Sequence, residues 1–430
     1  MINISFKSLA LIFGALLLAD SVKAQEENSN DEWGDDWGSD AWVEPSPFQW
    51  RFNTSLGYGQ LMDDEVNLND SVFKELRGVA ELNWKGEMSK LQLEVELISD
   101  NVVDDIELNT YQLNYTYSGI KDFDIKVGRQ VITWGTGDLL FLNDLFSKSW
   151  KSFFNGRNDK YLKPPVDAVR MSHYGKSFNW EVAFLPEFQA DETPDGERYS
   201  FYNPGIGIVQ PETRFLADVP DEPEFAARIF GRQESVEWAI YAYDGYYKSP
   251  SKLDLLQGWT YAEMSSIGAS IRMPWLGGLF NSEFAYYRSE DSNGNVPFTN
   301  NSQFRLLLGY ETELFKNTTL GTQVYLERTL NYNALIESSQ PGEQIPEENR
   351  TMLTFRLTNM AMQQRLANSL MLFYSPSDED HYLRASSSYK YSDKLKVVFG
   401  LNFIEGETDN TFLAQMKENS NWFSRIEYQF

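Results

Sequence analysis

The chain has 430 residues and a net charge of −26, with 63 acidic against 37 basic side chains. This charge disfavours nucleic acid as a partner, because phosphate binding requires a basic surface. The absence of cysteine excludes disulfides, thiolate metal sites and a lipid-modified cysteine, and we expect neither a cofactor nor a metal site.

Residues 1–24 have the pattern of a signal peptide. Lys7 precedes an apolar run from Leu9 to Ala19, and Val22 and Ala24 are small residues at the −3 and −1 positions of a cleavage site. The run is short for a membrane-spanning helix. The sequence therefore predicts export, with a signal anchor as the alternative.

Residues 25–46 form an acidic segment without lysine or arginine, which should be disordered when alone. It contains three tryptophans, Trp33, Trp37 and Trp42. Two interpretations stay open. The segment is either a solvated leader, or a tail that docks on a periplasmic partner or folds into the mouth of the following domain.

Residues 47–430 alternate between apolar and polar side chains, which is the pattern of two-faced β-strands. The alternation predicts about 18 strands at 48–58, 76–84, 91–97, 111–117, 123–127, 166–174, 178–184, 225–234, 238–240, 267–273, 280–286, 304–310, 320–326, 353–357, 365–374, 383–391, 395–403 and 422–430.

The connections alternate in length, with a short turn after each even-numbered strand. Longer loops are expected at 62–71, 99–107, 135–165, 187–224, 248–259, 291–301, 331–348, 375–381 and 405–419. This regularity, with 15% aromatic residues and a mean hydropathy of −0.46, is typical of bacterial transmembrane barrels. We predict an all-β, antiparallel barrel of 16–18 strands in a Gram-negative outer membrane. Both termini should be periplasmic, and lipid and lipopolysaccharide should surround the wall.

The last strand ends in Tyr428, Gln429 and Phe430. This ending resembles the C-terminal signal that the barrel assembly machinery reads, an aromatic last residue with apolar residues at alternate positions before it. We therefore expect that machinery as a partner, with Phe430 and Tyr428 in contact with it.

If the apolar ladders face lipid, the other phase of each strand faces the lumen. Acidic side chains then gather on one wall and basic ones on the opposite wall. The acidic set is Glu75, Glu81, Glu94, Glu96 and Glu181, with Arg77 among them, and the basic set is Arg356, Arg384, Lys390, Lys396 and Arg425. Across water, this segregation would create a transverse field; alternatively, these charges are simply hydrated at strand ends.

The segment GRQVITWGTGD begins at Gly128. Uninterrupted alternation would place Arg129 in lipid, so we expect a β-bulge at Gly128 that shifts the phase. Arg129, Val131 and Thr133 would then face the lumen, with Glu94 or Glu96 pairing with the arginine. Gln130, Ile132 and Trp134 would face outward, with Trp134 in the aromatic girdle.

The loop that follows contains apolar residues at roughly helical spacing, namely Leu139, Leu142, Leu145, Phe146 and Trp150. A short amphipathic helix within residues 139–154 is expected. Folded inward, it would narrow the lumen as a gating loop; folded outward, it would pack on the rim.

The string from Gly128 to Arg170 resembles the GRQxxxWG region of a poorly characterised outer-membrane barrel family, distantly similar to the alginate-export porins. Members of that family are often encoded beside inner-membrane transporters of the RND superfamily that handle hydrophobic or lipid-like molecules. The resemblance implies a barrel and a possible transporter partner. The alginate porin has a strongly basic lumen, whereas this chain is acidic, so the resemblance does not extend to alginate.

No enzymatic motif stands out. A phospholipase-type barrel would need His-x-Ser, but Tyr174 and Gly175 follow His173, and Tyr382 and Leu383 follow His381.

Two functions remain. The first is a conduit for a small amphipathic or hydrophobic molecule, with or without coupling to an RND-type transporter. The second is a passive diffusion porin with a mixed-charge constriction.

Overall fold

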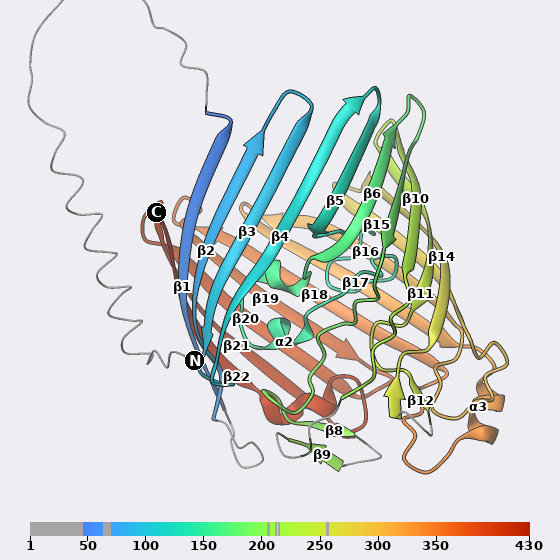
Figure 1. Ribbon diagram of the computed structural model, residues 1–430. Coiled ribbons are helices and arrows are strands. Elements are labelled where there is room, and N and C mark those ends of the chain that lie inside the picture. Colours follow the sequence, from blue (N-terminus) through green and yellow to red (C-terminus); the bar gives the residue numbers. More distant parts are fainter. Residues whose placement is uncertain (1–45, 63–69, 204–206, 211–212, 214–215, 255–257) are drawn as a thin grey trace, which may run out of the picture.

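The computed structural model describes residues 46–62, 70–203, 207–210, 213, 216–254 and 258–430. Within these ranges, 18 antiparallel strands form one closed barrel (Figure 1). The barrel closes because β1 (Phe48–Leu61) pairs both with β2 (Ser71–Lys85) and with the last strand, β22 (Asn421–Gln429). No helix in the described part of the chain is long and apolar enough to cross a membrane.

The other barrel strands are β3 (Ser89–Asp100), β4 (Asp105–Ile120), β5 (Phe123–Gln130), β6 (Val166–Tyr174), β7 (Asn179–Leu185), β10 (Glu224–Gln233), β11 (Val236–Tyr246), β14 (Glu263–Trp275), β15 (Gly278–Ser289), β16 (Gln303–Phe315), β17 (Thr318–Thr329), β18 (Asn349–Ala361), β19 (Leu366–Ser375), β20 (Asp380–Lys390) and β21 (Leu395–Gly406). In their described parts, the loops carry two small hairpins and four short helices: β8 (Phe201–Asn203) with β9 (Gly207–Val209), β12 (Lys252–Asp254) with β13 (Gly258–Thr260), α2 (Trp150–Phe154), η1 (Asp159–Leu162), α3 (Tyr332–Ser338) and η3 (Ala414–Asn419).

The predicted fold class, a transmembrane antiparallel barrel, is confirmed, and the strand number matches the alternation. Two of the predicted long loops, 99–107 and 375–381, are wrong. Residues 101–104 and 376–379 are tight turns, because the flanking strands continue through polar residues to the pairs Asp100 with Asp105 and Ser375 with Asp380. Backbone pairing does not require apolar side chains at strand ends. The segments 1–24 and 25–45, with all three tail tryptophans, lie outside the described residues.

Apolar side chains cover the outer face of the barrel, as the alternation predicts. Trp50 is 58% exposed, Ile267 57% and Phe399 54%. Such exposure suits a wall surrounded by hydrocarbon rather than water. The opposite phase of the same strands faces the lumen.

The bulge expected at Gly128 is wrong, because β5 stays in register with both neighbours there. Gly128 has a φ of +110°, and a Cβ would lie 2.3 Å from the carbonyl oxygen of Leu113 on β4. The glycine therefore permits a close backbone approach rather than a change of phase. A register shift does occur in the preceding strand pair, at Glu94 and Val95 of β3, where β4 accommodates the extra residue Tyr111.

Candidate functional site

The connection between β5 and β6, residues 131–165, folds into the barrel and is called the inner loop here (Figure 1). Its first residues turn inward at once, so that Ile132 and Trp134 are buried. The Trp134 indole donates a hydrogen bond to Glu181 Oε1 at 2.8 Å and packs edge-on against Phe146, with ring centroids 5.0 Å apart. The prediction that Trp134 lies in the outer girdle is therefore wrong.

Arg129 also differs from its prediction, because it stays in the outward phase. Its Nη1 lies 3.2 Å from Asp167 Oδ2 on β6, its register partner. Its other register partner is Leu113 of β4, which is 47% exposed on the outer face. Glu94 and Glu96 face the lumen and pair with other cations, so Arg129 has no part in the lumen charge arrangement.

One wall carboxylate, Glu283 of β15, fixes the beginning of the inner loop. Its Oε1 accepts hydrogen bonds from the backbone N–H groups of Thr136 and Gly137, the latter at 2.6 Å. Its Oε2 accepts from Asn143 Nδ2 at 2.7 Å. Because Glu283 is 1% exposed, these donors satisfy a carboxylate that would otherwise be costly to bury.

The helix expected within residues 139–154 is largely wrong, because only Trp150–Phe154 are helical. Before this helix, two backbone carbonyl groups accept hydrogen bonds from the Lys148 side chain instead of from helical N–H groups. Lys148 Nζ donates to the carbonyl oxygens of Asp144 at 3.1 Å and Phe146 at 2.7 Å, and lies 3.2 Å from Asp144 Oδ1. Burial lowers the pKa of Lys148 and raises the pKa of the nearby Asp191 carboxyl.

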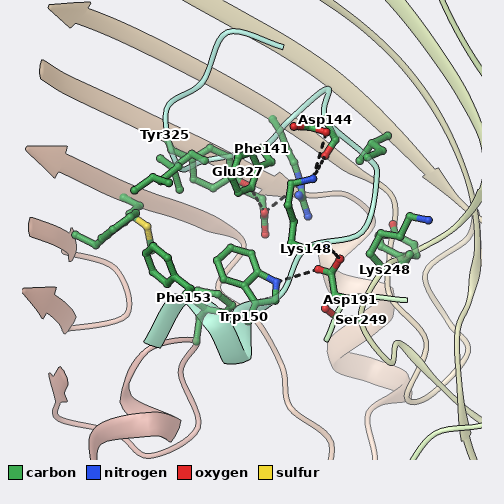
Figure 2. Close-up of a pocket in the computed structure, with 18 of the residues that line it drawn as sticks. Phe141, Asp144, Lys148, Trp150, Phe153, Asp191, Lys248, Ser249, Tyr325 and Glu327 are labelled. Carbon is green, nitrogen blue, oxygen red and sulfur yellow. Dashed lines mark hydrogen bonds and ion pairs between the residues drawn. The ribbon is translucent and has the colours of Figure 1, made fainter. Parts of the chain in front are cut away.

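The inner loop and the opposite wall enclose a cavity of about 310 Å³, called the recess here (Figure 2). Its position follows from the wall residues, which lie at the long-loop ends of β14–β20. Most of its lining is apolar or aromatic: Leu139, Leu140, Phe141, Leu145, Phe146, Trp150, Phe153, Phe154, Tyr247, Met264, Tyr287, Tyr325, Met352, Phe373, Tyr382, Phe412 and Leu413. Leu142 is buried nearby, and its carbonyl accepts a hydrogen bond from Tyr287 at 2.6 Å. The structure thus places the gating-loop residues inside the barrel, not on its rim.

A few charged groups interrupt this apolar lining. Arg305 Nε lies 3.2 Å from Glu327 Oε2, and the Tyr325 hydroxyl donates to the same carboxylate. Arg350 Nε donates to Asp378 Oδ2 at 2.5 Å, while its Nη2 has no hydrogen-bond partner in the described structure. An apolar cavity with a few fixed polar groups is the usual form of a small-molecule site.

Residues 157–160 cross the lumen and bond to both walls; we call them the crossbar. Toward the acidic wall, Arg157 Nη2 lies 2.6 Å from Glu75 Oε2 and Lys160 Nζ lies 2.7 Å from Glu94 Oε1. Toward the basic wall, Asp159 Oδ1 accepts from Arg384 Nη2 at 2.8 Å. The prediction of two walls facing each other across water is wrong here, because the crossbar lies between the walls and pairs with charged side chains of each.

Most of the remaining predicted lumen residues also make contacts, and Lys390 lines a cavity next to the crossbar. Arg356 Nη1 lies 2.9 Å from Asp138 of the inner loop, and Arg425 donates to the Gly156 carbonyl. Lys396 pairs with Glu427 at 2.5 Å, Glu96 pairs with Arg77, and Glu81 accepts from Asn53 Nδ2 at 3.3 Å.

Sequence reasoning missed Glu283, Arg157, Lys160, Arg305 and Arg350. The wall residues among them could have been found, because Glu283, Arg305 and Arg350 lie in the polar phase of predicted strands or beside one. Arg157 and Lys160 lie in a loop, where no periodicity indicates direction. No group of three or more His, Asp or Glu able to hold a metal occurs in the described ranges.

The sequence matches no family model and no curated protein. Solved structures with a similar fold include Acinetobacter baumannii OccAB3 (9% identity, covering 89% of this chain and 99% of that one, TM-score 0.54). Two others are from Pseudomonas aeruginosa. OccK3 (OpdO) has 10% identity and a TM-score of 0.53, and the match covers 89% of this chain and 95% of that one. OccK5 (OpdH) has 9% identity and a TM-score of 0.52, and the match covers 89% of this chain and 98% of that one. At such identities the likeness shows the fold alone, that of an outer-membrane-type β-barrel.

Proposed function

We propose that this chain is an outer-membrane conduit for a small amphipathic or hydrophobic molecule, which binds in the recess. The observation that carries the proposal is the lining of the recess, where aromatic and aliphatic side chains of the inner loop face those of the wall. A hydrated solute gains little from such a surface, whereas an apolar body gains about 25 cal/mol for each Å² removed from water. The charged groups at the edge would orient a polar head.

A passive diffusion porin is the second candidate. It is favoured by a polar vestibule of about 890 Å³ at the short-turn end, lined among others by Lys90, Asp124, Lys126 and Arg170. The crossbar opposes it, because its ion pairs bridge the lumen beside a second polar cavity of about 460 Å³. We therefore favour the conduit over an open pore.

Binding of 1-naphthol, measured by calorimetry on protein in liposomes, tests the recess directly. Phe153 lines the recess and contacts Trp150, Phe373 and Tyr382, which also line it. Phe153→Ala should weaken binding by tenfold or more, since losing one aromatic contact surface costs at least about 1.4 kcal/mol.

Phe399→Ala is the matched control, because Phe399 is an outward phenylalanine, 54% exposed. It should bind 1-naphthol like the unaltered protein. Equal affinity in both variants, or no saturable binding at all, would reject the recess as the binding site.

A further inference from the structure

The barrel wall is incomplete at the long-loop end between β4 and β11. β4 has 16 residues, whereas β5 has 8, β6 has 9 and β7 has 7. β5 pairs with β4 only as far as Arg129 opposite Leu113. Residues 105–112 of β4 consequently pair with β3 alone among the described strands. We call this interruption of the strand pairing the wall gap.

The free edge of β4 keeps an apolar outer face. Leu108 is 73% exposed and Ile106 45%, and Leu97, the partner of Leu108 on β3, is 49% exposed. At about 3.3 Å per residue, residues 105–112 extend roughly 25 Å along the strand. Because these outward side chains are apolar, we infer that this edge lies at the depth of hydrocarbon, where a bare sheet edge facing lipid is costly.

A charged pair borders the wall gap on the other side. Arg129 is the last outward residue of β5 and Asp167 the first of β6, and their side chains are 32% and 60% exposed. Arg129 Nε is buried without a hydrogen-bond partner in the described ranges. An arginine facing lipid near the midplane costs about 2–4 kcal/mol. The pair thus indicates a polar environment at this point of an otherwise apolar surface.

The inner loop lies directly behind the wall gap. Its two ends, after Gln130 and before Val166, are the margins of the gap. The Tyr111 hydroxyl of β4 donates to the Lys160 carbonyl at 3.1 Å, which holds η1 against the free edge. Ile132, Leu162 and Val166 are buried behind it, in the same apolar cluster as Phe146 and Phe153 of the recess. The gap and the recess are thus joined by one continuous cluster of packed apolar side chains.

We propose that the wall gap is a lateral opening through which a single-chain, lipid-like amphipathic molecule passes between the membrane and the recess. Its hydrocarbon chain lies along Leu108 and Ile106, while its polar head passes the Arg129–Asp167 pair. The proposal rests on the proposed function and gives the route by which cargo reaches the recess. The inner loop is the element that must move.

A second copy of the chain is the other occupant of such a gap. The observations favour the amphipathic molecule, because the Arg129–Asp167 ion pair forms within one chain and needs no group from a second copy. The apolar cluster behind the gap, which continues to the recess, also has no role in an interface between copies.

Thiol labelling in liposomes tests the opening, since the chain has no cysteine of its own. Asp167→Cys and, separately, Arg129→Cys are treated with a charged, membrane-impermeant methanethiosulfonate reagent. Phe284→Cys is the matched control, because Phe284 faces outward on β15 and is paired on both sides. Heat-modifiable migration verifies that each variant has folded.

We expect both gap cysteines to react at least about tenfold faster than Cys at position 284, because hydrocarbon excludes the charged reagent. A few mole per cent of oleoyl-lysophosphatidylcholine should slow the reaction at the gap and leave the control unchanged. No labelling at the gap, or labelling that lysophosphatidylcholine leaves unchanged, overturns the proposal. Cross-linking of two copies through position 167 overturns it in favour of an interface.

The two proposals fail separately. If the gap cysteines behave as the control while 1-naphthol still binds in a Phe153-dependent way, the lateral route is wrong and the recess stands. If lysophosphatidylcholine protects position 167 but 1-naphthol binding does not depend on Phe153, the opening stands and the recess is wrong.

Discussion

At the scale of single residues, Glu283 determines where the inner loop lies. One carboxylate on β15 receives the N–H groups of Thr136 and Gly137 and the amide of Asn143. These donors come from the part of the loop that leaves the wall, so the bonds direct the chain across the lumen. Hydrogen bonds to a charged acceptor contribute about 1.5–3 kcal/mol each.

Glu283→Gln should therefore release the inner loop. The amide keeps the shape of the side chain but loses the charge and presents two donors to groups that are themselves donors. We expect frequent current openings in planar bilayers where the unaltered protein has few. Glu311→Gln, on the exposed lumen face of β16, is the control and should behave like the unaltered protein. Identical traces for Glu283→Gln and the unaltered chain would remove Glu283 as the anchor.

The position of Arg129 could not be predicted from its neighbours in sequence. The free-energy cost of an arginine that faces lipid led to the expectation of a bulge at Gly128. In the structure the register continues, and Arg129 forms an ion pair with Asp167, its partner on the neighbouring strand. Asp167 is 38 positions away in sequence, and only the β5–β6 register brings the two together.

At the scale of elements, the crossbar links the two walls that the sequence predicted to be acidic and basic. Its charges alternate, so Arg157 and Lys160 bond to the acidic wall and Asp159 to the basic wall. These four consecutive residues thereby connect the two walls of the lumen through ion pairs. The Glu75 carboxylate depends on the crossbar, because it is buried between Arg77 and Arg157.

Arg157→Gln should weaken the crossbar more than Arg384→Gln. The first change removes the contacts to Glu75 and Asp100, which are buried, whereas the second removes one contact to Asp159, whose side chain is 70% exposed. Breaking one partner of a buried pair costs about 3–5 kcal/mol, and an exposed pair contributes about 0–1 kcal/mol.

The measurement is the thermal loss of heat-modifiable migration, together with the mean conductance. Arg157→Gln should lower the transition temperature and raise conductance, and Arg384→Gln should do neither to a comparable extent. The reverse order would show that the basic wall, not the acidic one, holds the crossbar.

Alternation predicted the strands well because each has one lipid face and one lumen face, and the period of two follows directly from that. It could not predict the course of the inner loop. The expected helix at 139–154 failed because Lys148 takes the backbone carbonyls of Asp144 and Phe146. Such contacts depend on tertiary packing and leave no periodic signal in the sequence.

At the scale of the whole molecule, the barrel closes where the last strand meets the first. The Phe430 N–H donates to the Phe52 carbonyl at 3.0 Å, and the Phe430 ring packs on Tyr428 with centroids 4.9 Å apart. The residues proposed to signal assembly are thus also part of the seam.

Deletion of Phe430 should reduce the amount of folded barrel in the outer membrane, because it removes both the terminal aromatic signal and a hydrogen bond of the seam. Heat-modifiable migration of membrane fractions measures this amount. Phe178→Ala, which truncates an exposed outward aromatic in the β6–β7 turn, is the control. Equal folded amounts in all three chains would exclude a role of the last residue in assembly.

The acidic tail is tested by removing residues 31–42, which include all three tail tryptophans. If the tail docks on a periplasmic or RND-type inner-membrane partner, the deletion should abolish recovery of that partner in a pull-down and leave barrel migration unchanged. Unchanged recovery would assign the tail to a solvated leader.

The central claim is that the inner loop closes the lumen to small ions and makes it a site for an amphipathic molecule. Current through single molecules in a planar bilayer tests it most directly. The unaltered chain should be closed or open only sporadically, and Arg157→Gln should carry a larger mean current. Steady, large, ohmic conductance from the unaltered chain would contradict the account and identify the barrel as a passive diffusion porin.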